Sequence, residues 1–505
     1  MEKARLLWFG YSGKDDHAHF AVIKKLKEED SIDFFVATGV KPHQSDSKVL
    51  NEPLHMHHDF LFANYQVSLS SGIPLIDQEI YQLCSDFEGE TLRMMDRLHG
   101  RGPENRFIDN FDTRRRMFLL HCSFWYSYLI DRRISHLVFI GIPHEVVTFV
   151  AYKVANILKL SVMILSPEKA GAPRKIDGIY YSSTHPQNSM TKSTFFVSES
   201  LEDVGLWQLS SKLLSVSESL GLKFSKGENF FMPIFEGSGD TETTKSKNPK
   251  PSLAMSVINE IRKTSKKRVE LTNLLLSTLK SQRQRQKHST LVKYSSDAAK
   301  VMLFSLAYQP EESTSPRGGI FVEQYFAIRA LSSCLPHGWK VRVREHPDQY
   351  GRGRPRPKDF LKEISLLPRV EIVAVDETSD DSLIQADAVA AIAGTMAVEA
   401  WARGIPLILF GKMWLKRAPG VFYIETIGDL KDAVKSICEG TKPSAEQIEA
   451  FKSWTISQSF LGSLGKIDPN NQELKSETIQ NLENLFRSWL SIEGSDETKS
   501  LSELT

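Results

Sequence analysis

The sequence predicts an α/β protein built from two Rossmann-like domains. Short apolar runs alternate with stretches of helical spacing in both halves of the chain. Within residues 298–411, four such runs end in polar or glycine-containing residues. Ligands of an open parallel sheet bind beyond the carboxyl ends of its strands, so this placement is typical of a binding site.

Length and composition support two globular domains. A chain of 505 residues is too long for one ordinary core. Hydrophobic residues make up 41% and charged residues 25%, as in soluble globular proteins. The 63 basic and 62 acidic residues give a net charge of +1, so no overall field would attract nucleic acid.

The expected location is cytoplasmic. The four cysteines lie far apart, which argues against a disulfide framework and favours a reducing compartment. The N-terminal apolar segment is too short for a signal peptide, and no apolar run reaches the length of about 18 residues that a membrane span needs.

The N-terminal half carries two β-α-β patterns. The strands are expected at residues 5–9 and 32–37, and again at 136–142 and 161–165. His144 and Glu145 follow the third strand, where an imidazole and a carboxylate can each serve general acid–base chemistry. The alternative is that both only cap the next helix and compensate its dipole. The cluster at residues 55–59 (HMHHD) is expected to form a polar loop, because no second group of metal ligands accompanies it.

The C-terminal half has its polar residues after successive strands. The strand and motif pairs are residues 300–308 before Gln309-Pro310-Glu311, 339–344 before Glu345-His346-Pro347, 388–393 before Gly394-Thr395, and 406–410 before Gly411.

Each motif suits a phosphate or a sugar. His346 can donate a ring N–H to a phosphate oxygen, from a turn that Pro347 fixes. Arg344 can add a charge-assisted hydrogen bond. Gly394-Thr395 stands at a helix N-terminus, which favours anions. Glu399, one turn further on, can accept hydrogen bonds from ribose hydroxyls.

These motifs resemble those of the capsule polysaccharide biosynthesis proteins. The matching residues are Tyr308-Gln309-Pro310-Glu311, Gly318-Gly319, Gln324, Leu335-Pro336, Gly338-Trp339, Arg344-Glu345-His346-Pro347, Gly394-Thr395, Glu399-Ala400, Gly404, Pro406 and Phe410-Gly411. That family includes the Kdo transferases of capsule assembly and is similar to bacterial sialyltransferases.

The resemblance implies a GT-B fold, with two Rossmann-like domains facing a cleft and an intervening helical region. It also implies that His346, Gly394 and Thr395 hold the nucleotide phosphate or ribose. The other residues predicted to bind the nucleotide sugar are Gln309, Glu311, Arg344, Pro347 and Glu399.

The expected domains are an N-terminal acceptor and catalytic domain, a polar and basic helical spacer, a nucleotide-sugar-binding domain, and a C-terminal helix with a disordered tail. Their predicted bounds are residues 1–236, 237–297, 298–440 and 441–505.

The expected function is a glycosyltransferase of surface or capsular polysaccharide biosynthesis. It would transfer a sugar from a nucleotide donor, with a CMP-sugar as one candidate, to a glycan or glycolipid acceptor. Glu145 or His144 would act as base or nucleophile, with Asp96 as a third candidate. Neither a metal nor another cofactor is expected, because helix N-termini, Arg344 and His346 can neutralise the phosphate. Further expected partners are other capsule-assembly proteins, with at most peripheral attachment at the inner face of the cell membrane.

Two alternatives remain open. A hydrolysing sugar-nucleotide epimerase shares the architecture, but such enzymes usually show Ser-Gly-Gly and paired glutamates where this chain has residues 394–399 (GTMAVE). A catalytically inactive glycan-binding or assembly protein is favoured by Ala307, because the family carries a histidine there. Arg344 likewise stands where the family carries a lysine, and an arginine keeps the charge but not its point geometry.

Overall fold

The computed structural model divides the chain into two compact units. Unit 1 consists of Met1–Arg174, Tyr181–Phe231 and Phe451–Thr505, and unit 2 of Lys175–Tyr180 and Met232–Ala450. The residues described are 3–9, 18–38, 53–55, 63, 77–98, 110–167, 175–176, 179–180, 194–198, 279, 282–283, 285–292, 294, 299–309, 311–346, 348–351, 356–357, 359–457, 460–462, 464 and 472–492. Most of the predicted spacer and the C-terminal tail therefore lie outside the described residues.

Unit 1 contains a seven-stranded sheet of order β15-β8-β5-β4-β1-β2-β3. Its parallel strands are β1 (Ala4–Phe9), β2 (Ile32–Thr38), β3 (Pro53–His55), β4 (His136–Ile140) and β5 (Ser161–Pro167). The sheet is extended by β8 (Thr194–Ser198), antiparallel to β5, and by β15 (Phe460–Leu461), antiparallel to β8. The central strands are apolar runs buried on both faces, as parallel strands covered by helices require.

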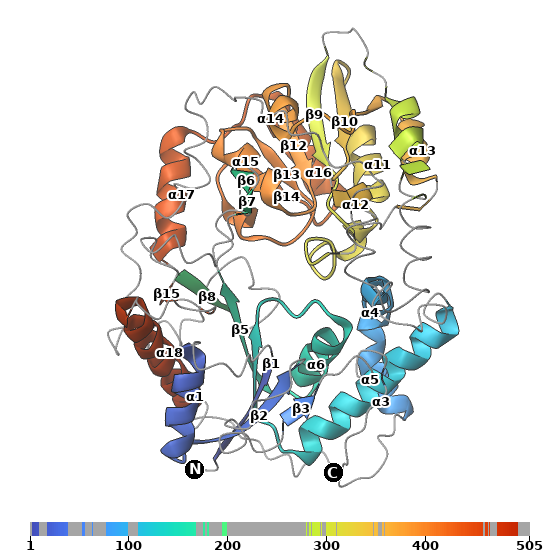
Figure 1. Cartoon of the computed structure of the whole chain (residues 1–505). Helices are drawn as coiled ribbons and strands as arrows, with labels where there is room; N and C mark the ends of the chain where they lie inside the picture. Colours follow the sequence, from blue (N-terminus) through green and yellow to red (C-terminus); the bar gives the residue numbers. More distant parts are fainter. Residues whose placement is uncertain are drawn as a thin grey trace. The chain divides into compact units, whose positions relative to one another are not determined.

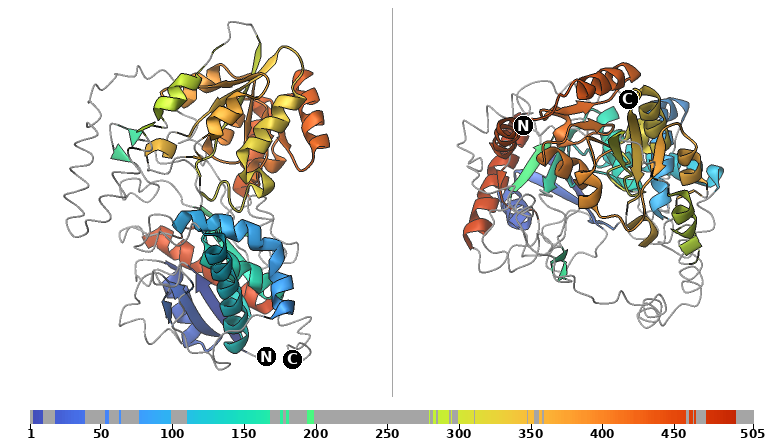
Figure 2. Two further views of the ribbon diagram at one scale, coloured as in Figure 1. Left: turned by 90° about the vertical axis from the view of Figure 1, so that its right-hand side faces the viewer. Right: turned by 90° about the horizontal axis from the view of Figure 1, so that it is seen from above.

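Helices cover both faces of this sheet (Figure 1). One face carries α3 (Gln78–Cys84), α4 (Glu88–Met94), α5 (Phe111–Asp131) and α6 (Val146–Ile157). The other carries α1 (Ala18–Glu28) and α18 (Gln472–Ile492), which lie side by side in both Figure 1 and Figure 2.

The C-terminal helix α18 belongs to the core of unit 1, whereas the sequence analysis set residues 441–505 apart as a separate segment. The physical reason is its apolar stripe, in which Leu482, Leu485 and Phe486 are completely buried. The ring of Phe486 stacks on Trp8 of β1, with 5.4 Å between the ring centroids. α18 thus covers this face of the sheet together with α1.

Unit 2 contains a six-stranded parallel sheet of order β11-β10-β9-β12-β13-β14. Its strands are β9 (Lys300–Ser305), β10 (Trp339–Arg344), β11 (Val370–Ile372), β12 (Ala388–Ala391), β13 (Leu407–Leu409) and β14 (Val421–Tyr423). Counted along the chain, this is the Rossmann order 3-2-1-4-5-6. The sequence predicted β9, β10, β12 and β13 but missed β11 and β14, whose three residues each are too few to show a pattern.

Unit 2 is also layered. On one face, α11 (Gln324–Cys334), α13 (Phe360–Ser365) and α16 (Ile427–Cys438) share a core with β9 and β10. α15 (Thr395–Ala402) packs against β12 and β13. The remaining elements of the chain are α12 (Asp348–Gly351), α14 (Ser379–Ile384), α17 (Ala445–Ser457), a hairpin of β6 (Lys175–Ile176) and β7 (Ile179–Tyr180), and the short 3-10 helices η2 (Ser85–Phe87), η3 (Met95–Leu98), η5 (Gly319–Val322) and η6 (Trp414–Arg417).

The expected α/β fold class with two Rossmann-like units is confirmed by these two sheets. Each unit has parallel strands in the 3-2-1-4-5 order along the chain, with helices packed on the sheet. In the part of the chain that the structure describes, no helix is both long and apolar enough to cross a membrane.

We predict that Phe486→Ala lowers the free energy of unfolding of unit 1 by about 3–5 kcal/mol, because it leaves a cavity against Trp8. Chemical denaturation followed by tryptophan fluorescence measures this. Gln480→Ala, at an exposed position of the same helix, is the control and should change it by less than about 0.5 kcal/mol. Equal stability of both variants would mean that α18 is not part of this core.

Candidate functional site

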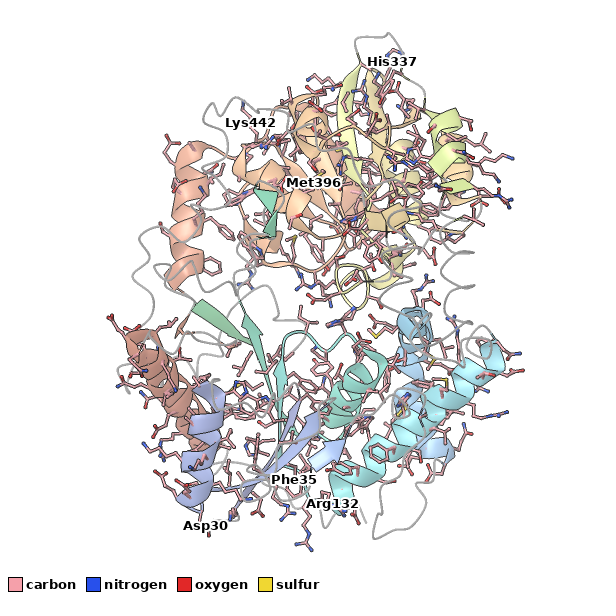
Figure 3. All side chains as sticks on the ribbon, viewed as in Figure 1. Asp30, Phe35, Arg132, His337, Met396 and Lys442 are labelled. Atoms are coloured by element: carbon pink, nitrogen blue, oxygen red, sulfur yellow. The ribbon has the colours of Figure 1, made fainter. Side chains whose placement is uncertain are left out.

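The candidate site of unit 2 lies where β9 stands between β10 and β12. Ser305 at the end of β9 pairs with Arg344 on one side and with Ala391 on the other. The chain then leaves β9 towards β10 and leaves β12 towards β13, so the connections diverge at this point. We call residues 307–309, 344–346 and 394–395, which end or follow these three strands, the switch-point edge. The labelled Met396 in Figure 3 marks its β12 side.

Arg344 brings a buried positive charge to the switch-point edge. The residue is only 8% exposed, and its Nη2 donates to the carbonyl oxygen of Glu377 over 3.3 Å. Among the described residues, no acceptor is found for the N–H of its buried Nε. Burial lowers the pKa of Arg344, and the carboxylates of Glu377, Glu399 and Glu345 oppose that shift. A guanidinium nevertheless stays charged, so Arg344 can attract an anion.

His346 presents one ring nitrogen as a donor. Its Nδ1 lies 3.2 Å from the backbone N–H of Asp348 and accepts from it, so the proton of the neutral ring is assigned to Nε2. Burial lowers the pKa of His346, against the opposing effect of Asp348 and Glu345. His346 is therefore neutral near pH 7, with an Nε2–H that can act as a hydrogen-bond donor.

Gly394 and Thr395 form the turn from β12 into α15. Gly394 has φ +126°, which glycine adopts without strain, and is the N-cap residue of the helix. Thr395 is exposed and opens the helix, whose first N–H groups lack partners within the helix. Glu399, one turn later, is half-buried and lies close enough to Arg344 to affect its pKa.

Gln309 has a structural role at the switch-point edge. Its Oε1 accepts from Arg356 Nη1 at 2.8 Å, and its Nε2 donates to the Val322 carbonyl at 2.5 Å. Both ends of the amide are thus engaged within the protein, so Gln309 shapes the site through its own contacts. The carbonyl oxygen of Glu311 accepts from Thr314. Pro347 lies outside the described residues.

In unit 1, His144 and Glu145 lie after β4, where the connections that follow the neighbouring strands β1 and β4 diverge. They follow β4, which pairs with β1 and β5 in the sheet. The Nδ1 of His144 lies 2.6 Å from the carbonyl oxygen of Ile142 and donates to it, which leaves Nε2 as the basic nitrogen of the neutral ring. Glu145 is the N-cap residue of α6, but its side chain makes no capping hydrogen bond.

Asp96 occupies a different setting in unit 1. It lies in η3, and its carboxylate forms an ion pair with Arg114 of α5 at 2.7 Å. Arg114 Nη1 also donates to the carbonyl oxygen of Leu92 in α4. These two contacts join α5 to α4 and η3. The ion pair competes with the catalytic role that the sequence analysis predicted for Asp96.

Sequence reasoning did not single out two buried groups of unit 2. Arg356 lies in the stretch GRGRPRP, which has no periodicity that marks a buried side chain. His288 lies in the predicted basic helix, yet it is only 1% exposed. Its Nδ1 accepts from the Tyr350 hydroxyl at 2.9 Å, and its Nε2 donates to the Val373 carbonyl at 2.7 Å. The described residues contain no group of three or more His, Cys, Asp or Glu side chains placed to hold a metal ion.

Comparisons with known proteins find similarity only among solved structures. No family model matches the chain, and no curated protein matches its sequence. One similar structure is the β-Kdo 2,7 transferase KpsC of Thermosulfurimonas dismutans, at 12% identity over 63% of this chain and 83% of that one, with a TM-score of 0.28.

Two others span nearly the whole chain. The UDP-GlcNAc 2-epimerase of Neisseria meningitidis is 11% identical over 96% of this chain and 100% of its own, with a TM-score of 0.24. A glycosyltransferase of Rickettsia africae is 9% identical over 98% and 100%, also with a TM-score of 0.24. Similarity this low does not assign a function, which has to be argued from the residues.

We predict that the stability of unit 2 falls as the pH drops below about 6.5, the ordinary pKa of histidine. Burial lowers the folded-state pKa of His288 and of His346, so the unfolded chain takes up more protons in this range and unfolding becomes easier. In His288→Gln, glutamine can keep one donor and one acceptor but cannot titrate. Its free energy of unfolding should therefore fall less between pH 7.5 and pH 5.5.

The control for this measurement is His337→Gln, because His337 is exposed. Denaturation curves at several pH values give the slope for each protein. An unchanged slope in His288→Gln, or the same change in both variants, would contradict the assignment.

Proposed function

We propose that the protein is a glycosyltransferase of surface or capsular polysaccharide biosynthesis that binds a nucleotide sugar at the switch-point edge. The observation that carries the proposal is the convergence there of three features suited to a phosphate. These are the buried guanidinium of Arg344, the Nε2–H donor of His346 and the N-terminus of α15 after Gly394. A sheet of Rossmann order binds nucleotides at this position.

The charges of the edge favour a ligand with few phosphate charges. Arg344 supplies one positive charge, while burial keeps His346 neutral. Glu377 and Glu399, near Arg344, would weaken the binding of each further negative charge. A CMP-linked sugar has one phosphodiester charge, whereas a UDP- or GDP-linked sugar has two. CMP-sugars are therefore the first donors to test.

The proposed catalytic group belongs to unit 1. Glu145 or His144 would act as base or nucleophile towards a glycan or glycolipid acceptor. For Glu145, the capping alternative is not supported, because its side chain makes no capping hydrogen bond although it stands at the N-cap position of α6. Asp96 is the weaker candidate, because Arg114 holds its carboxylate.

We predict that two single substitutions separate binding from chemistry. His346→Ala should weaken nucleotide binding about 10- to 100-fold, because one hydrogen bond to a charged group, about 1.5–3 kcal/mol, is lost. Glu145→Gln should leave nucleotide affinity nearly unchanged but lower turnover by about 100-fold or more, because an amide can neither take up a proton nor form a glycosyl ester. Calorimetry with CMP and UDP, and turnover with a panel of nucleotide sugars, measure the two effects.

His337→Ala serves as the control for the histidine substitution, since its side chain is exposed. Absence of both transfer and nucleotide binding in the unmodified protein would refute the proposal. Release of free sugar and nucleotide without an acceptor would instead favour a sugar-nucleotide epimerase. Nucleotide binding without any turnover would favour the inactive assembly protein to which Ala307 points.

A further inference from the structure

A buried ion pair lies beside the switch-point edge. Arg356 is 5% exposed and Glu345 is 7% exposed. The Nε and Nη2 of Arg356 donate to the two carboxylate oxygens of Glu345, over 2.6 and 2.7 Å. This two-pronged geometry fixes both the distance and the plane of the two groups.

The same guanidinium also forms hydrogen bonds with residues that follow β9, and so links the end of β10 to the end of β9. Its Nη1 donates to Gln309 Oε1 and its Nη2 to the Ala307 carbonyl oxygen, each over 2.8 Å. Gln324 holds Ala307 as well, since its Oε1 accepts the Ala307 N–H at 2.7 Å and its Nε2 donates to the Ala307 carbonyl at 3.1 Å. These contacts explain why β9 ends at Ser305, before the point that the sequence predicted.

Glu345 also forms a hydrogen bond with the backbone of His346. Its Oε1, which accepts from Arg356, also accepts the backbone N–H of His346 at 2.7 Å. The His346 ring is in turn oriented by the N–H of Asp348 on its Nδ1. The location of the His346 Nε2–H therefore depends on a chain of contacts that starts at Arg356.

We propose that Arg356 is a positioning residue of the nucleotide site, which holds the Ala307–Gln309 turn and His346 in one fixed arrangement. The inference rests on the proposed function in so far as His346 contacts the nucleotide. Arg356 itself would touch no ligand, because its guanidinium is buried and engaged with Glu345, Gln309 and Ala307. The rival explanation is that Arg356 only neutralises the buried charge of Glu345.

Two variants distinguish these explanations. Glu345→Gln combined with Arg356→Met removes both charges, and such replacements of a buried pair are often neutral for stability. Arg356→Lys keeps the charge but loses the planar fork. The matched control is Arg342→Met in β10, because Arg342 pairs with Glu371 at 3.2 Å and Glu371 keeps a second partner in Lys340.

The experiment combines ligand-free crystal structures with calorimetry on the full chain, using CMP and UDP as probes. We expect the double variant and Arg356→Lys to fold, with the Ala307–Gln309 turn or the His346 ring displaced. Their affinity for the nucleotide that the unmodified protein binds should fall about tenfold or more, because a misplaced donor loses most of its hydrogen bond. Arg342→Met should match the unmodified protein in both measurements.

The proposal would be overturned if, in either variant, the Ala307–Gln309 turn and His346 keep their positions and the nucleotide affinity is unchanged. It would also be overturned if the turn is displaced but the nucleotide affinity is unchanged. If the double variant fails to fold, Arg356→Lys decides the question alone. If the unmodified protein binds neither nucleotide, the proposed function fails. The ligand-free structures still show in that case whether Arg356 positions His346.

Discussion

The strand order of the unit 2 sheet is the constraint on which the candidate site depends. β9 and β12 are neighbours in the sheet, but each is followed by a connection that leads away from the other. Parallel strands joined by right-handed crossovers then leave an open position at their shared carboxyl edge. The ends of β9, β10 and β12 therefore lie along the same edge of the sheet, with Arg344 on one side of Ser305 and Ala391, shortly before Gly394, on the other.

The polar residues of this edge fall into two groups by their burial and pairing. Arg356 is hydrogen-bonded to Glu345 and Gln309, and Gln324 binds the backbone of Ala307, so that these residues hold the ends of β9 and β10 together. Arg344 is equally buried, yet no carboxylate forms an ion pair with it among the described residues. A rigid, internally paired support beside a charge available to a ligand is the arrangement that a preorganised anion site requires.

Sequence patterns predicted the fold class and the strand-end motifs because both rest on local signals. Buried parallel strands read as apolar runs, and the glycine and histidine motifs follow them directly. The roles of Arg356 and Gln309 could not be predicted, because they depend on residues 11 to 47 positions apart. The place of α18 was missed for the same reason: its apolar stripe is visible in the sequence, but the strand Ala4–Phe9 that it covers lies at the other end of the chain.

A crystal structure with bound CMP tests the central claim most directly. The account predicts that the phosphate lies at the switch-point edge, within hydrogen-bond distance of His346 Nε2 and of the first N–H groups of α15, with the Arg344 guanidinium beside it. CMP bound elsewhere in unit 2 or in unit 1, while this edge stays free of ligand in the same crystal, would contradict it.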